Sequence, residues 1–250
     1  MNNITLDKED AKMAMVFSYL ALRSLIGILG VAFPFLLVIG ASIYSFSGIA
    51  IESSISTYYH TSAKHIFGGV LFIISFFLFA YIGYEDNEGS IPHCGRIFSK
   101  LPKRILSKLG FKDNTVGNWA CLWGICLTLF PTTPHGIVGK LHYAFAAMFF
   151  ACLIYFCFFS FTRSKPGKMD DDKRKRNRIY RRCGYSMIVF LILIPLGQCS
   201  KLFGGYELVH DKINYVFWLE TFALWAFGVS WLAKGKVEEG LALSLFRSAK

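Results

Sequence analysis

The side chains best suited to chemistry gather in one short polar segment. Residues 52–61 read Glu-Ser-Ser-Ile-Ser-Thr-Tyr-Tyr-His-Thr, a dense set of hydroxyl groups with one carboxylate and one imidazole. Ser56 and His60 are four residues apart, so a helical turn would bring a nucleophile within reach of a base. Such a pair supports acyl or phosphoryl chemistry on a lipid. The alternative is a hydrogen-bonded loop that closes one end of a helical bundle, with Tyr59 anchored at the aqueous interface.

Two further polar side chains lie inside strongly apolar stretches. Glu220 is the one acidic residue within such a stretch, and His142 lies near the start of another. A carboxylate in hydrocarbon is costly, so Glu220 is expected to face the interior of a bundle with a partner, or to remain protonated. We expect Glu220 and His142 to meet directly or through water, with Gln198 at a comparable depth. A polar clasp between helices is the structural alternative.

Imidazoles and carboxylates also suit zinc when three or more converge. The candidate metal ligands are His60, His142 and His210, but the sequence contains no HExxH or HxxxH pair. Zinc is therefore a candidate cofactor that depends on convergence in space. No catalytic residue is assigned outright, and the candidates are Ser56, His60, His142 and Glu220. The candidate ligand-binding residues are Tyr59, His60, His142, Gln198 and Glu220.

Apolar helices must position these groups. A stretch of about 20 apolar residues crosses a hydrocarbon core of about 30 Å. The sequence predicts an all-α polytopic membrane protein, with one domain over residues 1–250, six transmembrane helices and short loops. Gly27 with Gly30, and Gly68 with Gly69, are expected to allow close contact between helices. The six apolar stretches run at about 24–47, 66–84, 116–130, 141–162, 183–198 and 213–233.

The basic residues indicate the orientation. Of 27 Lys and Arg residues, 23 lie before the first stretch, in residues 85–115, in residues 163–182 or after residue 233. Basic residues are retained on the cytoplasmic side, so both termini are expected in the cytoplasm, as an even number of spans requires. The same rule explains the net charge of +11 without a nucleic-acid partner. Residues 96–112 form a basic amphipathic cytoplasmic segment that suits membrane lipids with anionic headgroups.

Several motifs together resemble a known family. They are STYYHT at 56–61, LFPT at 129–132, GKLHYAFA at 139–146, RNRIYR at 176–181, and Glu220 followed by AFGVSW at 226–231. They resemble an uncharacterised bacterial six-span inner-membrane protein family, defined by a domain of unknown function. The layout is more distantly similar to the six-span DRAM/Frag/Sfk group. The resemblance implies a multi-pass protein of the bacterial inner (plasma) membrane and transfers no mechanism.

Three functions fit the sequence. The first is a membrane protein with an outward-facing polar pocket that binds a lipid or small solute. The second is a metal-dependent or Ser/His lipid hydrolase or transferase acting at the outer leaflet. The third is a proton-coupled transporter that uses Glu220 and His142. Convergence of the imidazoles with Glu220 would favour catalysis or a metal, whereas dispersed imidazoles around a groove would favour binding. The oligomeric state is not fixed by the sequence.

Overall fold

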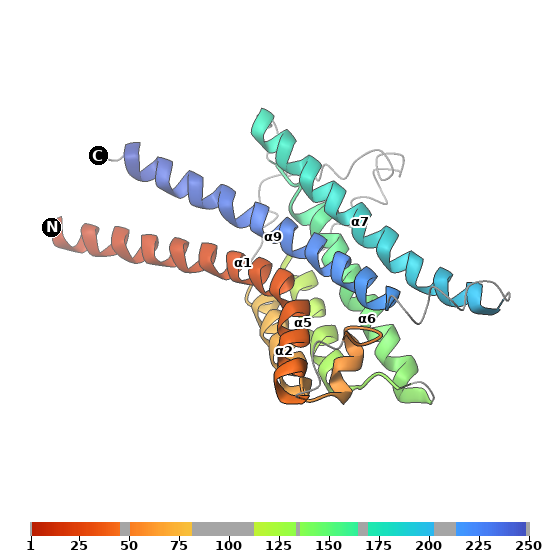
Figure 1. Cartoon of the computed structure of the whole chain (residues 1–250). Helices are drawn as coiled ribbons and strands as arrows, with labels where there is room; N and C mark the ends of the chain where they lie inside the picture. Colours follow the sequence, from red (N-terminus) through yellow and green to blue (C-terminus); the bar gives the residue numbers. More distant parts are fainter. Residues whose placement is uncertain are drawn as a thin grey trace.

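The computed structural model of the chain describes residues 2–45, 51–81, 113–133, 136–164, 170–202 and 214–248. Every regular element in this part of the chain is helical (Figure 1). The all-α class predicted from the sequence is therefore confirmed. The elements in chain order are α1 (Asn2–Ser45), the short 3-10 helix η1 (Ser56–His60), α2 (Lys64–Phe79), α5 (Asp113–Leu129), α6 (Ile137–Tyr155), the π-helical turn η2 (Phe156–Ser160), α7 (Asp171–Leu202) and α9 (Tyr215–Ser248).

Each predicted apolar stretch overlaps one of these helices, with η2 continuing α6. Among the described residues, four helical segments are long and apolar enough to cross a membrane, by length and composition. The helices α2 and α5 are shorter, at 16 and 17 residues. The predicted amphipathic segment at residues 96–112 lies outside the described residues. The four long segments are Ala21–Ile43, Ile137–Ser160, Asp171–Gly197 and Tyr215–Gly235.

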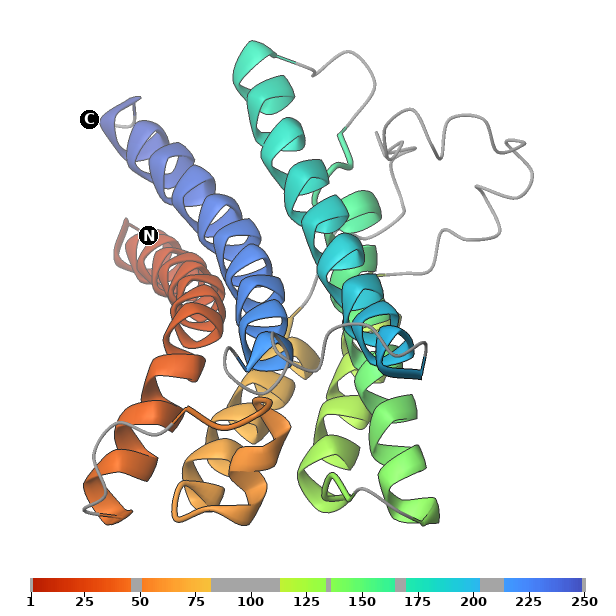
Figure 2. The same ribbon diagram turned by 45° about the vertical axis from the view of Figure 1, so that its right-hand side comes forward.

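The helices pack as a ring in which chain neighbours are mostly spatial neighbours. In order around the ring, α1 contacts α2, α2 contacts α5, α5 contacts α6, and α6 with η2 contacts α7. The helix α9 then packs between α7 and α1. Figures 1 and 2 show that the N-terminal part of α1 and the C-terminal part of α9 extend in the same direction. We call this end of the bundle the termini end. The opposite end, where η1 lies beside the first turn of α9, is the η1 end (Figure 2).

Glycines bring α1 and α9 into close contact. A Cβ atom added to Gly27 would lie 2.9 Å from the carbonyl oxygen of Gly228, and one added to Gly228 would lie 2.7 Å from that of Gly27. Side chains larger than hydrogen would push the backbones apart, as in other close helix pairs of membrane proteins. The indole Nε1 of Trp225 on α9 also donates to the carbonyl of Val31 on α1 at 3.1 Å. The predicted role of Gly27 in helix contact is confirmed.

An aromatic layer fills the bundle near the termini end. Trp231 on α9 is fully buried, and its ring centroid lies 5.0 Å from that of Tyr81 and 5.1 Å from that of Phe161. Large apolar side chains on the outer faces of the helices are exposed instead, among them Phe35, Phe76 and Ile192. This pattern, an apolar exterior around an aromatic core, suits a helix bundle surrounded by lipid.

Candidate functional site

Glu220 holds the polar segment 51–60 against α9. Its Oε2 accepts a hydrogen bond from the backbone N–H of Ile55 at 2.6 Å. One turn earlier on α9, the backbone N–H of Phe217 donates to the carbonyl of Ser53 at 3.1 Å. Ile55 immediately precedes η1 and is buried, so its N–H has no helical acceptor and would otherwise be costly to bury. The carboxylate therefore supplies a missing acceptor and ties α9 to the segment before η1, whereas the clasp expected from the sequence joined two helices.

The same segment is fixed at two further points. The side-chain amide of Asn214 donates to the carbonyl of Ile51 at 2.7 Å, from a left-handed backbone with φ of 47° that Asn tolerates well. Tyr58 is fully buried, and its hydroxyl accepts from the N–H of Glu52 at 3.3 Å. Burial raises the pKa of the Tyr58 phenol. Because the segment has contacts along most of its length, it closes the η1 end as an ordered plug.

His60 and His142 meet the same short connection between α5 and α6. His60 Nε2 donates to the carbonyl of Thr132 at 2.5 Å, and His142 Nδ1 donates to the carbonyl of Phe130 at 2.7 Å. A carbonyl oxygen only accepts, so these nitrogens carry the protons and the other ring nitrogen of each neutral imidazole is an acceptor. Their acceptors, the carbonyls of Thr132 and Phe130, are two residues apart, so both imidazoles lie at this connection. His142 is buried and His60 is exposed.

Two pairings expected from the sequence are not formed. Glu220 accepts from the backbone N–H of Ile55, and His142 donates to the backbone carbonyl of Phe130. These bonds take the place of the expected direct contact between Glu220 and His142. Ser56 does not meet His60, because residues four apart in a 3-10 helix of three residues per turn lie on different faces. The hydroxyl of Ser56 instead lies 3.0 Å from that of Ser54.

In the part of the chain that the structure describes, no cluster of metal-ligating side chains supports the zinc hypothesis. Among those residues, no three His, Cys, Asp or Glu side chains lie where they could hold one ion. His210, the third candidate ligand for zinc, lies outside the described residues. Gln198 lies within α7, but its side chain is also outside the described part. Zinc at His60, His142 and His210 stays a prediction.

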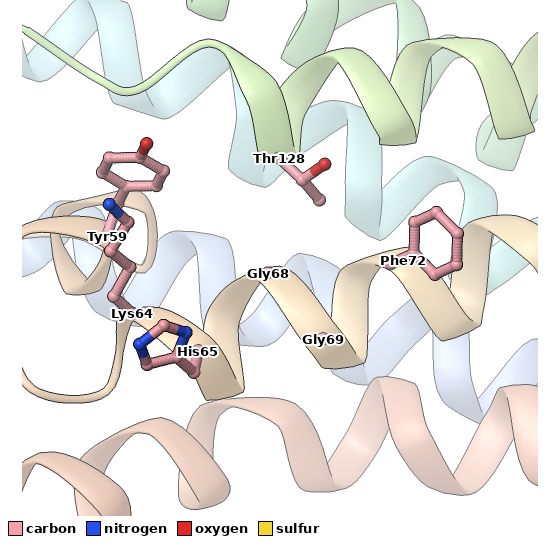
Figure 3. A pocket seen from close by; sticks show the side chains of 7 residues that line it. All are labelled: Tyr59, Lys64, His65, Gly68, Gly69, Phe72 and Thr128. Atoms are coloured by element: carbon pink, nitrogen blue, oxygen red, sulfur yellow. The ribbon is translucent and has the colours of Figure 1, made fainter.

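A groove of about 340 Å³ runs along α2 beside this plug. Figure 3 shows Tyr59, Lys64 and His65 at one end of the groove and Phe72 at the other, with Thr128 of α5 facing α2. The Lys64 ammonium lies 4.6 Å from the centroid of the Tyr59 ring, a cation–π distance. The floor consists of Gly68 and Gly69. The groove is therefore polar at the η1 end and apolar toward the middle of the bundle.

The two floor glycines do not have the role expected from the sequence. Within the described part of the chain, a Cβ atom added to Gly68 or Gly69 would meet nothing within 4 Å, whereas one on Gly124 would lie 2.0 Å from the Ser75 hydroxyl oxygen. Gly68 and Gly69 therefore do not permit close helix contact. Sequence reasoning missed this groove because an adjacent glycine pair in an apolar stretch is more often a packing surface. The adjoining Lys64 and His65 were the available signal.

A larger apolar groove lies between α7 and α9. Its volume is about 740 Å³, and Tyr215 of α9 reaches across it to donate to the carbonyl of Ile194 at 3.2 Å. A Cβ on Gly197 would lie 2.7 Å from the Tyr215 ring, so this glycine admits the tyrosine. The lining is apolar apart from the Tyr215 hydroxyl and offers no charged group for recognition. The lining residues are Leu193, Leu196, Gly197, Tyr215, Trp218, Leu219 and Phe222.

Comparison with known proteins leaves the site to be interpreted from its geometry. No family model, no curated protein and no solved structure matches this chain. The resemblance to a bacterial six-span family therefore remains a prediction from the sequence motifs. Of the predicted site residues, His60 and His142 come together at the connection between α5 and α6. Glu220 lies at the plug, and Tyr59 lines the α2 groove.

Proposed function

We propose that this protein binds a lipid or lipid-like amphiphile in the α2 groove at the η1 end. The protein would be a six-span protein of the bacterial inner membrane, with both termini in the cytoplasm. The charge distribution supports this orientation, and the common ring of four long apolar helices with α2 and α5 supports the span number. The outward-facing pocket expected from the sequence then corresponds to this groove.

The single observation that carries the proposal is the glycine floor. Glycine inside a helix costs about 1 kcal/mol relative to alanine, so it needs a compensating reason. Gly27 and Gly228 have one in the α1–α9 contact, but no neighbouring atom of the described residues lies within 4 Å of a Cβ position on Gly68 or Gly69. A floor without side chains keeps space open on a helix whose neighbouring faces are bulky. An acyl chain or another slender apolar group fits that space.

The ends of the groove match the two ends of an amphiphile. Lys64 and His65 are exposed at the end nearest η1, where a cationic side chain suits an anionic headgroup. Phe72 is 50% exposed at the other end, within the apolar part of α2. Most small-molecule sites combine a large apolar lining with a few placed polar groups. Hydrolysis receives less support, because Ser56 bonds to Ser54 rather than to His60.

The test is to fill the groove without harming the fold. Gly69→Leu places a side chain in open space and removes a glycine from a helix, so unfolding should occur at the same or a higher temperature. Native mass spectrometry of gently purified protein should then show less co-purified lipid than in the wild type. Ala147→Leu is the control, because it places the same leucine side chain at an exposed position of α6 outside the groove. Equal lipid retention in all three proteins would overturn the proposal.

The orientation has an independent test. Ser53→Cys puts a thiol at an exposed position of the plug, and Lys175→Cys puts one at an exposed position near the start of α7. In intact spheroplasts, a membrane-impermeant maleimide should label the first and should reach the second only after permeabilisation. The wild type, with its seven native cysteines, gives the background. The reverse pattern would place the termini outside.

A further inference from the structure

The α2 side of the groove is a single strip along one face of the helix. The lining residues from α2 are Lys64, His65, Gly68, Gly69 and Phe72. They recur at intervals of one, three and four residues, and such positions share a face of an α-helix. From Lys64 to Phe72 the helix rises by about 12 Å, at roughly 1.5 Å per residue. The groove therefore has two ends at known positions on one rigid element.

The end nearest η1 carries the positive charge. Figure 3 shows the Lys64 side chain directed toward the Tyr59 ring, and its ammonium lies 4.6 Å from the ring centroid. His65, the next residue, is also exposed. None of the described residues that line the groove is acidic. A ligand with an anionic headgroup is therefore expected to place that headgroup at this end.

The other end is closed by the ring of Phe72. Figure 3 shows this ring beyond the two floor glycines, at the end of the groove opposite Lys64. Phe72 is 50% exposed, and the next two turns carry Phe76 and Phe79, which are 54% and 51% exposed. These positions follow at intervals of four and three residues, so they continue the same side of α2. The open glycine floor is thus followed by a row of bulky rings.

The middle of the groove suits methylene groups. The hydroxyl of Thr128, on the opposite wall, donates to the carbonyl of Ile125 at 2.7 Å, so its proton is already used within α5. The volume of about 340 Å³ lies near the lower end of the range of about 300–1,000 Å³ for ligand pockets. Such a volume suits one acyl chain rather than two. An extended chain of roughly ten carbon atoms spans the helical rise between the two ends.

We propose that Phe72 sets the length of the acyl chain that lies in the α2 groove, with an anionic headgroup beside Lys64. The inference rests on the proposed function and adds which lipids fit. A shorter chain leaves part of the floor empty, whereas a longer chain must leave the groove at the Phe72 ring. Both lose packing contacts, so occupancy passes through a maximum at one chain length. The chain belongs either to a single-chain lipid or to one chain of a two-chain phospholipid.

The experiment is a competition among chain lengths, read by native mass spectrometry. Full-length, delipidated protein in detergent receives an equimolar mixture of lysophosphatidylglycerols with even-numbered chains from decanoyl to stearoyl. The mass of each complex identifies its chain, and the wild type should prefer one length. In Phe72→Ala the next bulky ring is one turn away, so the preferred chain should lengthen by about 5.4 Å, or roughly four methylene groups. This variant should fold, because the Phe72 ring is half exposed and makes no ring contact within the described residues.

Phe76→Ala is the matched control. It removes the same side chain from a similarly exposed position of the same helix, but Phe76 does not line the groove. The control should therefore keep the chain preference of the wild type. Once the ring of Phe72 is absent, Phe76 becomes the end of the groove, so Phe72→Ala/Phe76→Ala should prefer longer chains than Phe72→Ala alone. This order of effects is expected only if the rings limit the chain in sequence along α2.

The headgroup and the source of the chain have their own arms. Lys64→Gln should weaken binding of lysophosphatidylglycerol relative to zwitterionic lysophosphatidylcholine by up to about fivefold, the range of an exposed ion pair, with the preferred length unchanged. Lys140→Gln, at an exposed position near the start of α6, should behave like the wild type. Phosphatidylglycerol that displaces the lysolipid identifies a two-chain phospholipid as a source, and failure to displace it identifies a single-chain lipid. Either result agrees with the proposal.

The length inference and the proposed function fail under different results. If Gly69→Leu loses lysolipid but Phe72→Ala keeps the chain preference of the wild type, the groove binds lipid and Phe72 does not set the length. An equal shift in Phe76→Ala and Phe72→Ala would also overturn the role of Phe72. If the wild type shows no preference among the chains, the groove has no fixed length. If Gly69→Leu binds every lysolipid as the wild type does, both proposals are wrong.

Discussion

Removing the carboxylate of Glu220 should release the plug from α9. In Glu220→Ala, the buried N–H of Ile55 loses an acceptor at 2.6 Å. A hydrogen bond to a charged group contributes roughly 1.5–3 kcal/mol, whereas side-chain bonds between membrane helices average about 0.6 kcal/mol. Because Ile55 lies in the plug and not in a span, we expect a loss of about 1–2 kcal/mol in the free energy of unfolding. Glu220→Gln keeps an oxygen acceptor and should lose less.

A second anchor of the plug makes the reasoning testable by a double-mutant cycle. Asn214→Gly removes the 2.7 Å bond to Ile51, and glycine accepts the backbone φ of 47° at that position. Both anchors hold the same segment, so releasing one should reduce the contribution of the other to the free energy of unfolding. The double variant Glu220→Ala/Asn214→Gly should therefore lose less stability than the sum of the single variants.

The assay combines global and local readouts. Chemical unfolding of the four proteins in one detergent gives the cycle, and the labelling rate of a Cys at exposed position Ser53 reports on release of the plug. Glu220→Ala should raise that rate more than Glu220→Gln. An unchanged labelling rate and unchanged stability in Glu220→Ala would refute the role as an anchor. Equal losses in Glu220→Ala and Glu220→Gln would show that the negative charge matters rather than the acceptor oxygen.

Three other residues give direct predictions. Gly228→Ala should lower stability by about 1–3 kcal/mol, because its Cβ would lie 2.7 Å from the carbonyl oxygen of Gly27; an unchanged unfolding midpoint would contradict this packing. His142→Ala should cost about 1–3 kcal/mol, because it removes a buried side chain and the donor to the part-buried carbonyl of Phe130, whereas exposed His60→Ala should cost much less; equal unfolding curves would count against the assigned burial. Burial raises the pKa of Tyr58 above 10.0, so its stabilising contribution is complete below pH 10.0 and is lost as pH rises through the folded pKa. Tyr58→Phe should reduce this alkaline loss of stability, and identical pH profiles in both proteins would argue against it.

The apolar stretches of the sequence predicted the positions of the helices, because burial in lipid and helix formation both favour long apolar runs. They did not predict where every helix ends. The helix α7 begins at Asp171, well before the predicted stretch at residue 183, because the basic residues between them are good helix formers even though they are polar. The helix α9 likewise continues to Ser248, past the predicted end at residue 233. Hydropathy reports where the chain becomes polar, which marks the predicted membrane boundary. A helix can continue beyond that boundary, as α7 and α9 do.

Candidate residues could be predicted by type, but their partners could not. Glu220 was singled out correctly as a residue that needs a partner, yet its partner is a backbone N–H, which carries no signal in the sequence. The spacing of Ser56 and His60 suggested a catalytic pair only for an α-helical turn. The 3-10 conformation changes the angle between them, and that choice depends on contacts of the plug with α9 and the α5–α6 connection.

Buried basic residues at the ends of the apolar stretches could not be recognised by counting charges. Arg23, Arg163 and Lys234 each adjoin a predicted apolar stretch, where a basic residue is explained by topology alone. Each of these three residues directly adjoins the end of a predicted stretch, so it is counted with the exposed flanking residues. The ring brings several such ends over one aromatic layer, which places these flanking residues inside the bundle. Exposed Lys175 carries the same charge in the same basic region and satisfies the topological rule equally well. Orientation therefore needs only the number of basic residues, whereas their burial is set by the fold, and comparing the unfolding midpoints of Lys234→Met and Lys175→Met measures the effect of burial.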